Sequence, residues 1–220
     1  MISTNPNPNP SPSPNPNLTS TPTPAQPRLI LASGSPYRHQ LLSRLRLPFE
    51  VLAPDIDESA LPGEAAQDTA LRLARAKAAA VAARMPDALV IGSDQVATLN
   101  GEAIGKPGDH ARALLQLRQM RGQRVIFHTA LCLWDTRRAG AVQLENIQTV
   151  VTVRDLADAE LDAYLRIEQP YDCAGSAKNE GLGIAILENI ESADPTALTG
   201  LPLIALVGML RKAGVEFFKR

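Results

Sequence analysis

A short run of small, hydroxyl-bearing residues near the start of the chain has the chemistry of an anion-binding site. Residues 29–42 read LILASGSPYRHQLL, so an apolar run leads through Ser33 and Ser35 into a helix start. Ser35 is placed to cap that helix, and Pro36 suits its first position. Free N–H groups and the positive dipole end of a helix attract phosphate. Arg38 is unfavourable next to that dipole, so we interpret it as a phosphate ligand; a capped helix with a solvated arginine is the alternative.

An aspartate next to another apolar run is the second chemical feature. Residues 91–96 read IGSDQV, and Asp94 is expected to close a buried strand. A carboxylate held rigidly at the edge of a sheet suits a general base or a metal ligand, although Asp also commonly caps turns.

Two lysines are placed to meet negative charge. Lys77 lies in an Ala-rich segment with mostly apolar neighbours and no acidic residue four positions away, so we expect it to lean toward an anion. Lys106 is held between Gly105 and Pro107. The segment 101–107, GEAIGKP, is not a Walker A loop, because it has one residue too few between its glycines and Pro follows the lysine.

The acidic segment 55–59, DIDES, allows two enzymatic interpretations. Its carboxylates, Glu58 among them, could coordinate Mg²⁺ beside a triphosphate. The string also nearly matches the DxDx[TV] signature of aspartyl-phosphate phosphatases, with Asp55 as the nucleophile. This second match is weak, because Pro54 separates it from the preceding strand and Ser59 stands where the signature has Thr or Val.

Size and composition exclude several classes of protein. The chain has 220 residues, and its 22 Lys and Arg nearly balance its 23 Asp and Glu. This balance is poorly suited to binding nucleic acid or a membrane surface, and no apolar run is long enough to span a bilayer. Cys132 and Cys173 form no metal-binding or disulfide pattern. A cytoplasmic enzyme fits these limits.

The chain divides into a tail and one domain. Residues 1–27 alternate Pro with Asn, Ser and Thr and have almost nothing apolar to bury, so we expect a disordered, partly polyproline-II tail. The tail lacks the basic start and apolar core of a secretory signal. Residues 28–220 are expected to form the folded domain.

Apolar periodicity predicts an alternation of strands and helices in that domain. The expected strands are 28–32, 49–53, 88–92, 96–99, 102–104, 125–135, 142–153 and 182–190. One helix is expected to begin at Pro36, and four more are expected at 65–84, 110–121, 158–168 and 202–212. Asn100 and Gly101 have the signature of a tight hairpin, and a hairpin among these alternating elements predicts a mixed sheet.

Taken in order, these segments resemble the Maf family of nucleotide pyrophosphatases. The resemblance covers residues 28 to about 213 and rests on the blocks LILASGSPYR, DIDE, RAKA, IGSDQV, IGKP, FHT, AGSAKNEGLG and TGLPL. It implies an α/β fold with an elongated mixed β-sheet, flanking helices and two lobes around a cleft. It also implies a divalent metal cation, Mg²⁺ or Mn²⁺, and release of pyrophosphate plus a nucleoside monophosphate.

The resemblance assigns a role to each functional residue by its motif position. Asp94 would accept the proton of the attacking water, and Glu58, with Asp94, would bind the metal. The residues that would hold the phosphates are Ser33, Arg38, Lys77 and Lys106. One departure is His39, which stands where the family usually carries a second basic residue and brings less charge.

Three positions divide the family by substrate, and this chain has Tyr37, Gln95 and Glu180 at them. The set resembles the branch acting on 7-methyl-GTP, which typically has Trp, Gln and Glu; the alternative is the branch acting on dTTP and UTP. A cationic 7-methylguanine would stack on Tyr37, unless that ring merely packs. Glu180 would accept hydrogen bonds from the guanine N1–H and exocyclic amine.

The resemblance adds two expectations about partners. The protein would act on a small nucleotide and would form a homodimer. A regulatory role in cell division, which the name of the family suggests, is an alternative from another class. The intact set of phosphate-binding and catalytic residues argues against a pure binding module.

Overall fold

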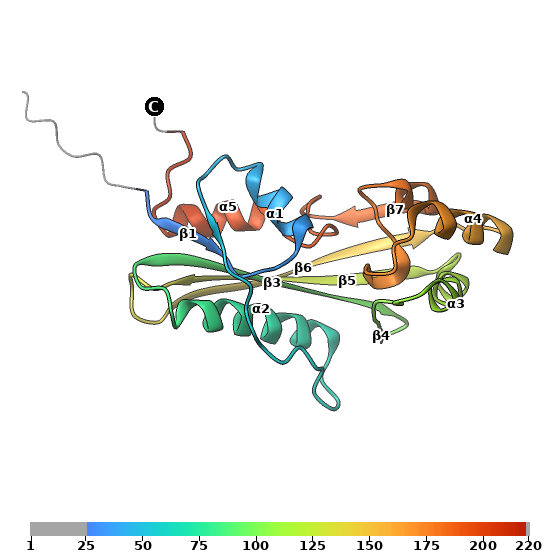
Figure 1. Cartoon of the computed structure of the whole chain (residues 1–220), viewed down its shortest axis with the longest axis horizontal. Helices are drawn as coiled ribbons and strands as arrows, with labels where there is room; N and C mark the ends of the chain where they lie inside the picture. The colour runs from blue at the N-terminus through green and yellow to red at the C-terminus, as the bar shows by residue number, and fades with distance from the viewer. Residues whose placement is uncertain (1–25, 219–220) are drawn as a thin grey trace, which may run out of the picture.

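A seven-stranded mixed sheet forms the centre of the fold in the computed structural model, which describes residues 26–218 (Figure 1). The strand order is β2-β1-β3-β5-β6-β7, with β4 also paired to β3. The strands are β1 Arg28–Leu31, β2 Glu50–Val51, β3 Ala88–Leu99, β4 Glu102–Ile104, β5 Arg124–Asp135, β6 Ala141–Val153 and β7 Leu187–Ser192. β2, β1 and β3 run parallel and the other pairs are antiparallel, which confirms the predicted mixed sheet.

Five α-helices flank the sheet in the described part of the chain, as predicted. They are α1 Pro36–Ser43, α2 Ala66–Ala82, α3 His110–Met120, α4 Asp158–Glu168 and α5 Leu203–Lys212. Two of the predicted caps are present: the side chain of Ser35 accepts from the backbone of Arg38, and the side chain of Asp109 accepts from that of Arg112. No helix among residues 26–218 is long and apolar enough to cross a membrane.

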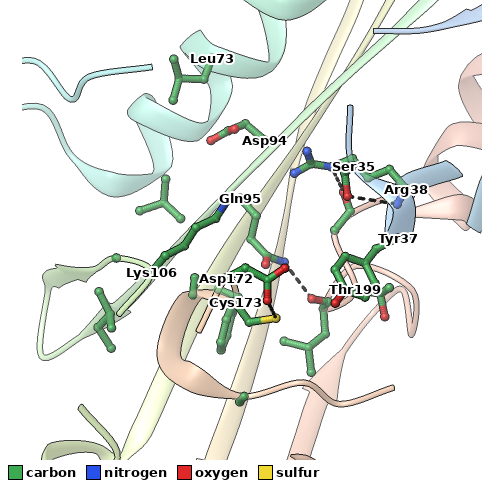
Figure 2. Close-up of a pocket in the computed structure, with 18 of the residues that line it drawn as sticks. Ser35, Tyr37, Arg38, Leu73, Asp94, Gln95, Lys106, Asp172, Cys173 and Thr199 are labelled. Atoms are coloured by element: carbon green, nitrogen blue, oxygen red, sulfur yellow. Dashed lines mark hydrogen bonds between the residues drawn. The ribbon is translucent and has the colours of Figure 1, made fainter. Parts of the chain in front are cut away.

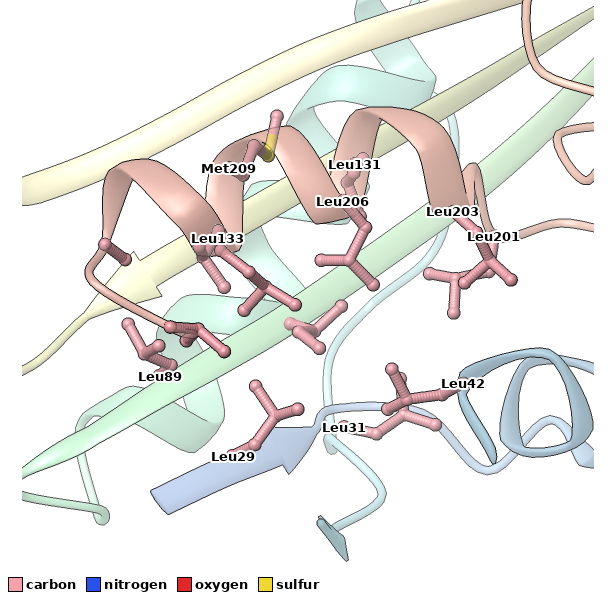
Figure 3. Close-up of a cluster of buried hydrophobic side chains, with 14 of the residues drawn as sticks. Leu29, Leu31, Leu42, Leu89, Leu131, Leu133, Leu201, Leu203, Leu206 and Met209 are labelled. Atoms are coloured by element: carbon pink, nitrogen blue, oxygen red, sulfur yellow. The ribbon is translucent and has the colours of Figure 1, made fainter. Parts of the chain in front are cut away.

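Alternation along the strands builds two layers of core at one end of the sheet. Leu29 and Leu31 face α1 and α5 in the cluster of Figure 3, whereas Ile30 and Ala32 face α2 on the opposite side. This is the two-residue period of a strand buried on both faces. The two layers make the first lobe of the domain.

A separate apolar cluster makes the second lobe. It joins α3 and α4 to the end of β3, the start of β5 and the end of β6. These segments lie at the opposite end of the elongated molecule from the first lobe (Figure 1). Leu117 and Leu161 are fully buried there, and Phe127 and Val151 contribute from the sheet. The predicted α/β architecture with two lobes is therefore confirmed.

Four predicted strands differ from the structure. Residues 88–92 and 96–99 belong to one strand, because β5 pairs continuously with Leu89 through Leu99. Residues 182–190 begin as a 3₁₀ helix, Leu182–Ile186, since the backbone of Gly183 packs against that of Lys178 and donates to its carbonyl. The predicted strand 49–53 is regular only at Glu50–Val51. Of the predicted tail 1–27, all but two residues lie outside the described part, and its disorder stays a prediction.

Candidate active site

A cavity of about 740 Å³ lies beside β3, at a place where one edge of this strand has no neighbour. β1 pairs with β3 as far as Ile91, and β4 pairs with it from Ala97 onward, so residues 92–96 lack a strand partner on this edge. Side chains from both faces of β3 therefore reach the cavity. Asp94 points from the α2 face and Gln95 from the other (Figure 2). Asp94 thus lies inside a strand and not, as predicted, at its end.

The loop before α1 forms one wall of the cavity, with its hydroxyls turned inward. Ser33 Oγ accepts from the backbone N–H of Ser35 at 3.1 Å and from Arg38 Nη1 at 3.5 Å. Arg38 Nε donates to the carbonyl of Gly200 at 2.8 Å, which fixes the plane of the guanidinium. Burial lowers the pKa of Arg38, while the negative charges of Asp94 and Glu58 oppose this shift. The predicted phosphate residues Ser33 and Arg38 are therefore side by side.

Lys77 joins two acidic side chains that are far apart in sequence. Its Nζ lies 2.7 Å from Asp94 Oδ1 and 2.9 Å from Glu58 Oε2. The side chains of Lys77 and Asp94 are only 7% and 9% exposed, whereas that of Glu58 is 58% exposed. An ammonium has three N–H donors, so one remains for a ligand. The sequence predicted that Lys77 contacts an anion, and in the structure the nearest anionic group is the carboxylate of Asp94.

The same arrangement decides which residues fit a divalent cation. The carboxylates of Glu58 and Asp94 both lie at hydrogen-bonding distance from the ammonium of Lys77 and are therefore close to each other. Mg²⁺ in nucleotide sites is commonly held by one or two carboxylates, with phosphate and water completing its ligands. Within residues 26–218, no group of three or more His, Cys, Asp and Glu is placed to hold a metal ion. The pair therefore fits a metal that arrives with a phosphate-bearing ligand.

Lys106 lies on the opposite wall, in the loop between β4 and α3. Its side chain lines the cavity and is exposed (Figure 2). Two contacts hold the loop: Gln116 Nε2 donates to the Gly105 carbonyl at 2.9 Å, and the Gly108 N–H donates to the Tyr171 carbonyl at 3.0 Å. The backbone on either side of Lys106 is therefore held in place, while its exposed side chain can change conformation to contact a bound anion.

The same cavity contains the three predicted base-recognition residues. Tyr37, Gln95 and Glu180 all line it. Burial raises the pKa of Tyr37, and the neighbouring Cys173 and Asp172 add to this effect. Apolar residues also line the cavity, among them Val125, Phe127, Val151, Leu187 and Leu198. A flat, partly apolar ligand with polar edges fits this surface.

Two of the acidic residues and His39 lie outside the cavity. Asp55 does not line it, and Asp57 accepts from the backbone N–H of Ser59 at 2.9 Å. An aspartyl-phosphate mechanism through Asp55 therefore has no support in the geometry. His39 is exposed, with its ring 5.2 Å from that of Phe49, so the loss of charge at this position does not alter the cavity wall.

Sequence reasoning missed several residues of the site. Asp172 and Cys173 line the cavity, with the thiol 3.5 Å from the carboxylate, and burial raises the Cys173 pKa to about 11 (Figure 2). The carbonyl of Gly200 and the hydroxyl of Thr129 also bind site residues; the blocks TGLPL and FHT contain them, but the sequence assigned them no role. Asp172 and Cys173 could have been predicted as site residues, because they directly precede the block AGSAKNEGLG.

Comparisons with known proteins agree with this geometry. The profile of the family described as "Maf-like protein" matches residues 28–213. A 7-methyl-GTP pyrophosphatase of Cupriavidus metallidurans is 66% identical over 193 residues, which cover 88% of this chain and 96% of the relative. Proteins of the same name from Burkholderia pseudomallei and Thiobacillus denitrificans are 66% and 60% identical, over 87% and 86% of this chain and 90% and 94% of theirs.

Solved structures give more distant likenesses. The Ham1 protein of Staphylococcus aureus aligns with a TM-score of 0.43 and 15% identity, over 58% of this chain and 72% of that one. A nucleoside-triphosphatase / dITP/XTP pyrophosphatase of Mycobacterium abscessus aligns with a TM-score of 0.41 and 15% identity, over 85% and 96%. Because the family profile and relatives of 60–66% identity cover nearly the whole described domain, the chain belongs to the Maf-like protein family.

Proposed function

We propose that this protein is a nucleoside triphosphate pyrophosphatase that hydrolyses the α–β phosphate bond of 7-methyl-GTP. One observation carries the proposal: a single cavity is lined by Asp94, by the cationic side chains of Arg38, Lys77 and Lys106, and by Tyr37, Gln95 and Glu180. We place the triphosphate at Asp94 and the cations, the phosphate end, and the base at the other three residues, the base end. The printed names of relatives at 60–66% identity support the choice of substrate.

The phosphate end supplies positioning, charge and a proton acceptor. Arg38 and Lys106, on opposite walls, and Ser33 bind the phosphate oxygens. Asp94 takes a proton from the attacking water as the α–β bond breaks, so that the nucleoside monophosphate and pyrophosphate are released. Its Oδ1 is held by Lys77 at 2.7 Å, and no hydrogen bond among the described residues uses its Oδ2. General-base assistance of this kind contributes a factor of about 10² to 10⁴.

Glu58 and Asp94 are the residues that would hold a divalent cation, Mg²⁺ or Mn²⁺. When bound with the substrate, such a cation neutralises charge on the phosphate oxygens. Lys77 lies between the same two carboxylates and keeps them close before a ligand arrives. The exposed Glu58 can turn toward the ligand, whereas the buried Asp94 cannot move far.

The base end supports a cationic guanine. Tyr37 offers a half-buried aromatic face, and Glu180 offers an exposed carboxylate on the cavity wall. N7-methylation makes guanine positive, which strengthens stacking on an aromatic ring and attraction to a carboxylate. Asp172, on the same wall, adds negative charge.

A nucleotide screen with both products identified tests the proposal. 7-Methyl-GTP, GTP, dTTP and UTP are each incubated with Mg²⁺ or Mn²⁺, with Asp94→Asn as the matched inactive control. We expect pyrophosphate and 7-methyl-GMP in equal amounts. Release of inorganic phosphate and a diphosphate would refute the pyrophosphatase assignment, and a preference for dTTP or UTP would leave the reaction but replace the substrate.

The setting of the enzyme follows from the same proposal. We infer that it acts on free nucleotides in the cytoplasm and not on nucleic acid, since its net charge is only −1. We also infer a homodimer, which light scattering at micromolar concentration tests. A role in cell division that survived Asp94→Asn would favour the regulatory alternative over catalysis.

A further inference from the structure

The side-chain amide of Gln95 has no N–H left for a ligand. Its Nε2 donates to Thr129 Oγ1 at 2.9 Å and to the backbone carbonyls of Ala197 and Leu198 at 3.0 Å each. An amide nitrogen has two hydrogens, and three acceptors surround this one. Turning the amide round would put its oxygen against two carbonyl oxygens. Gln95 is therefore fixed with Oε1 available to the cavity that it lines.

Thr129 completes this arrangement from the neighbouring strand. It lies directly opposite Gln95 in the pairing of β3 with β5 and is fully buried. Its hydroxyl accepts from Gln95 Nε2 and at the same time donates to the Ala197 carbonyl at 3.0 Å. A hydroxyl can accept and donate together, which no apolar residue of this size can do. Thr129, Gln95 and the Ala197 carbonyl thus form a closed triangle of hydrogen bonds.

The backbone that carries the two carbonyls is itself held in place. Asp194 is 2% exposed and accepts from four donors: the N–H and hydroxyl of Thr196 and the N–H groups of Ile204 and Ala205, at 2.6–3.2 Å. These contacts tie the segment 194–201 to the start of α5. The carbonyls of Ala197 and Leu198 are therefore rigid acceptors, and they set the direction of the Gln95 amide.

We propose that Thr129 is a positioning residue for base selection. Resting on the proposed function, this assigns Thr129 the task of holding Gln95 so that the cavity presents an acceptor and no donor at this point. Only a base edge with an N–H donor satisfies such an acceptor, because an unpaired polar group in a partly desolvated site is costly. Guanine has two adjacent donors, its N1–H and its exocyclic amine, whereas the single N3–H of uracil is flanked by carbonyl oxygens that this acceptor would repel.

The test compares Thr129→Val, which keeps the shape and removes the hydroxyl, with Thr129→Ser, which keeps the hydroxyl. Thr98→Val is the matched control, because Thr98 is buried on β3 and its hydroxyl donates to the Ile126 carbonyl outside the cavity. We expect Thr129→Val to lower the ratio of kcat/KM for 7-methyl-GTP over UTP about three- to tenfold, through KM. Thr129→Ser and Thr98→Val should keep the wild-type ratio, and inhibition by pyrophosphate should not change in any variant.

A double-mutant cycle shows whether Thr129 acts through Gln95. In a Gln95→Leu background, Thr129→Val should cause no further change in the ratio. Additive effects, an unchanged ratio in Thr129→Val, or equal losses on both nucleotides would each overturn the proposal. If wild type prefers another nucleotide, the assigned substrate is wrong, and the same cycle is then measured with that nucleotide, so the two failures remain distinct. Should Thr129→Val not fold, Thr129→Ala takes its place.

Discussion

Gly92 lies where α2 packs most closely on β3, and replacing it with alanine should disturb the site without touching a functional group. An added Cβ would overlap the carbonyl oxygen of Ala74 and would lie 2.8 Å from the backbone nitrogen of Ala78. Ordinary contacts are 3.4 Å or longer, so the Ala78 contact alone requires α2 to move away by ~0.6 Å, and the closer Ala74 contact requires a larger movement. Both neighbours are helix backbone and cannot rotate away, and overpacking of this kind costs about 1–3 kcal/mol of stability.

The same movement reaches the chemistry through Lys77, which lies between Ala74 and Ala78 on α2. Its ammonium is now 2.7 Å from Asp94 Oδ1, and this contact would lengthen. Because a misplacement of 1 Å can cost about 10²-fold in rate, we expect Gly92→Ala to lower kcat/KM about 10- to 100-fold.

Urea unfolding and pyrophosphate release measure the two effects separately. The matched control is Gly208→Ala in the middle of α5, where an added Cβ meets nothing within 4 Å. We expect this variant to keep full activity and to gain about 0.5–1 kcal/mol, since alanine suits a helix better than glycine. Wild-type stability and wild-type kcat/KM in Gly92→Ala would refute the argument that the close helix–strand contact sets the geometry of Lys77.

Four further outcomes are expected. Asp94→Asn should fold normally and lose about 10²- to 10⁴-fold in kcat, and near-normal turnover would show that another group is the base. Glu180→Gln should lower kcat/KM for 7-methyl-GTP roughly 10- to 100-fold but leave UTP little changed; an equal loss on both would contradict a contact with the base. The hydrogen bond from Arg72 lowers the pKa of Glu64 to about 2, so the stabilisation is present above the ordinary value of 4.5 and is lost as the pH falls toward 2. The difference in Tm between wild type and Glu64→Gln should therefore vanish over that range, and a constant difference would mean that charge is not involved. Deletion of residues 1–25 should leave Tm and kcat/KM unchanged, because they have almost nothing apolar to bury, and a large drop in Tm would refute this.

Much of the fold could be predicted from local patterns, because two of the helices have side-chain caps and most strands have clear apolar runs. Ser35 and Asp109 mark the starts of α1 and α3, and Asn100 with Gly101, both at positive φ, marks the β3–β4 hairpin. Of the predicted strand 182–190, the first part, Leu182–Ile186, was predicted wrongly, whereas residues 187–190 lie in β7. Its apolar residues suit a strand, but the approach of Gly183 to the backbone of Lys178 is a tertiary contact with no local signal.

The residues that line the site were easier to predict than the ion pairs and hydrogen bonds between them. Every predicted site residue lines the cavity, because the motifs mark the turns and strands that surround it. The pairing of Lys77 with Asp94 could not be predicted, since it depends on how α2 lies across β3. The contacts of Gln95 with the carbonyls of Ala197 and Leu198 were equally hidden, because backbone acceptors are the same in every residue type.

The unpaired edge of β3 also bears on how the protein avoids aggregation. An open strand edge is a template for pairing with a strand from another molecule. Here the open stretch covers only residues 92–96, with β1 closing it at Ile91 and β4 from Ala97. An intruding strand would have to enter between two existing neighbours, β1 and β4, which leave it no room to extend along β3. The gap is therefore open to a small molecule and closed to a second polypeptide.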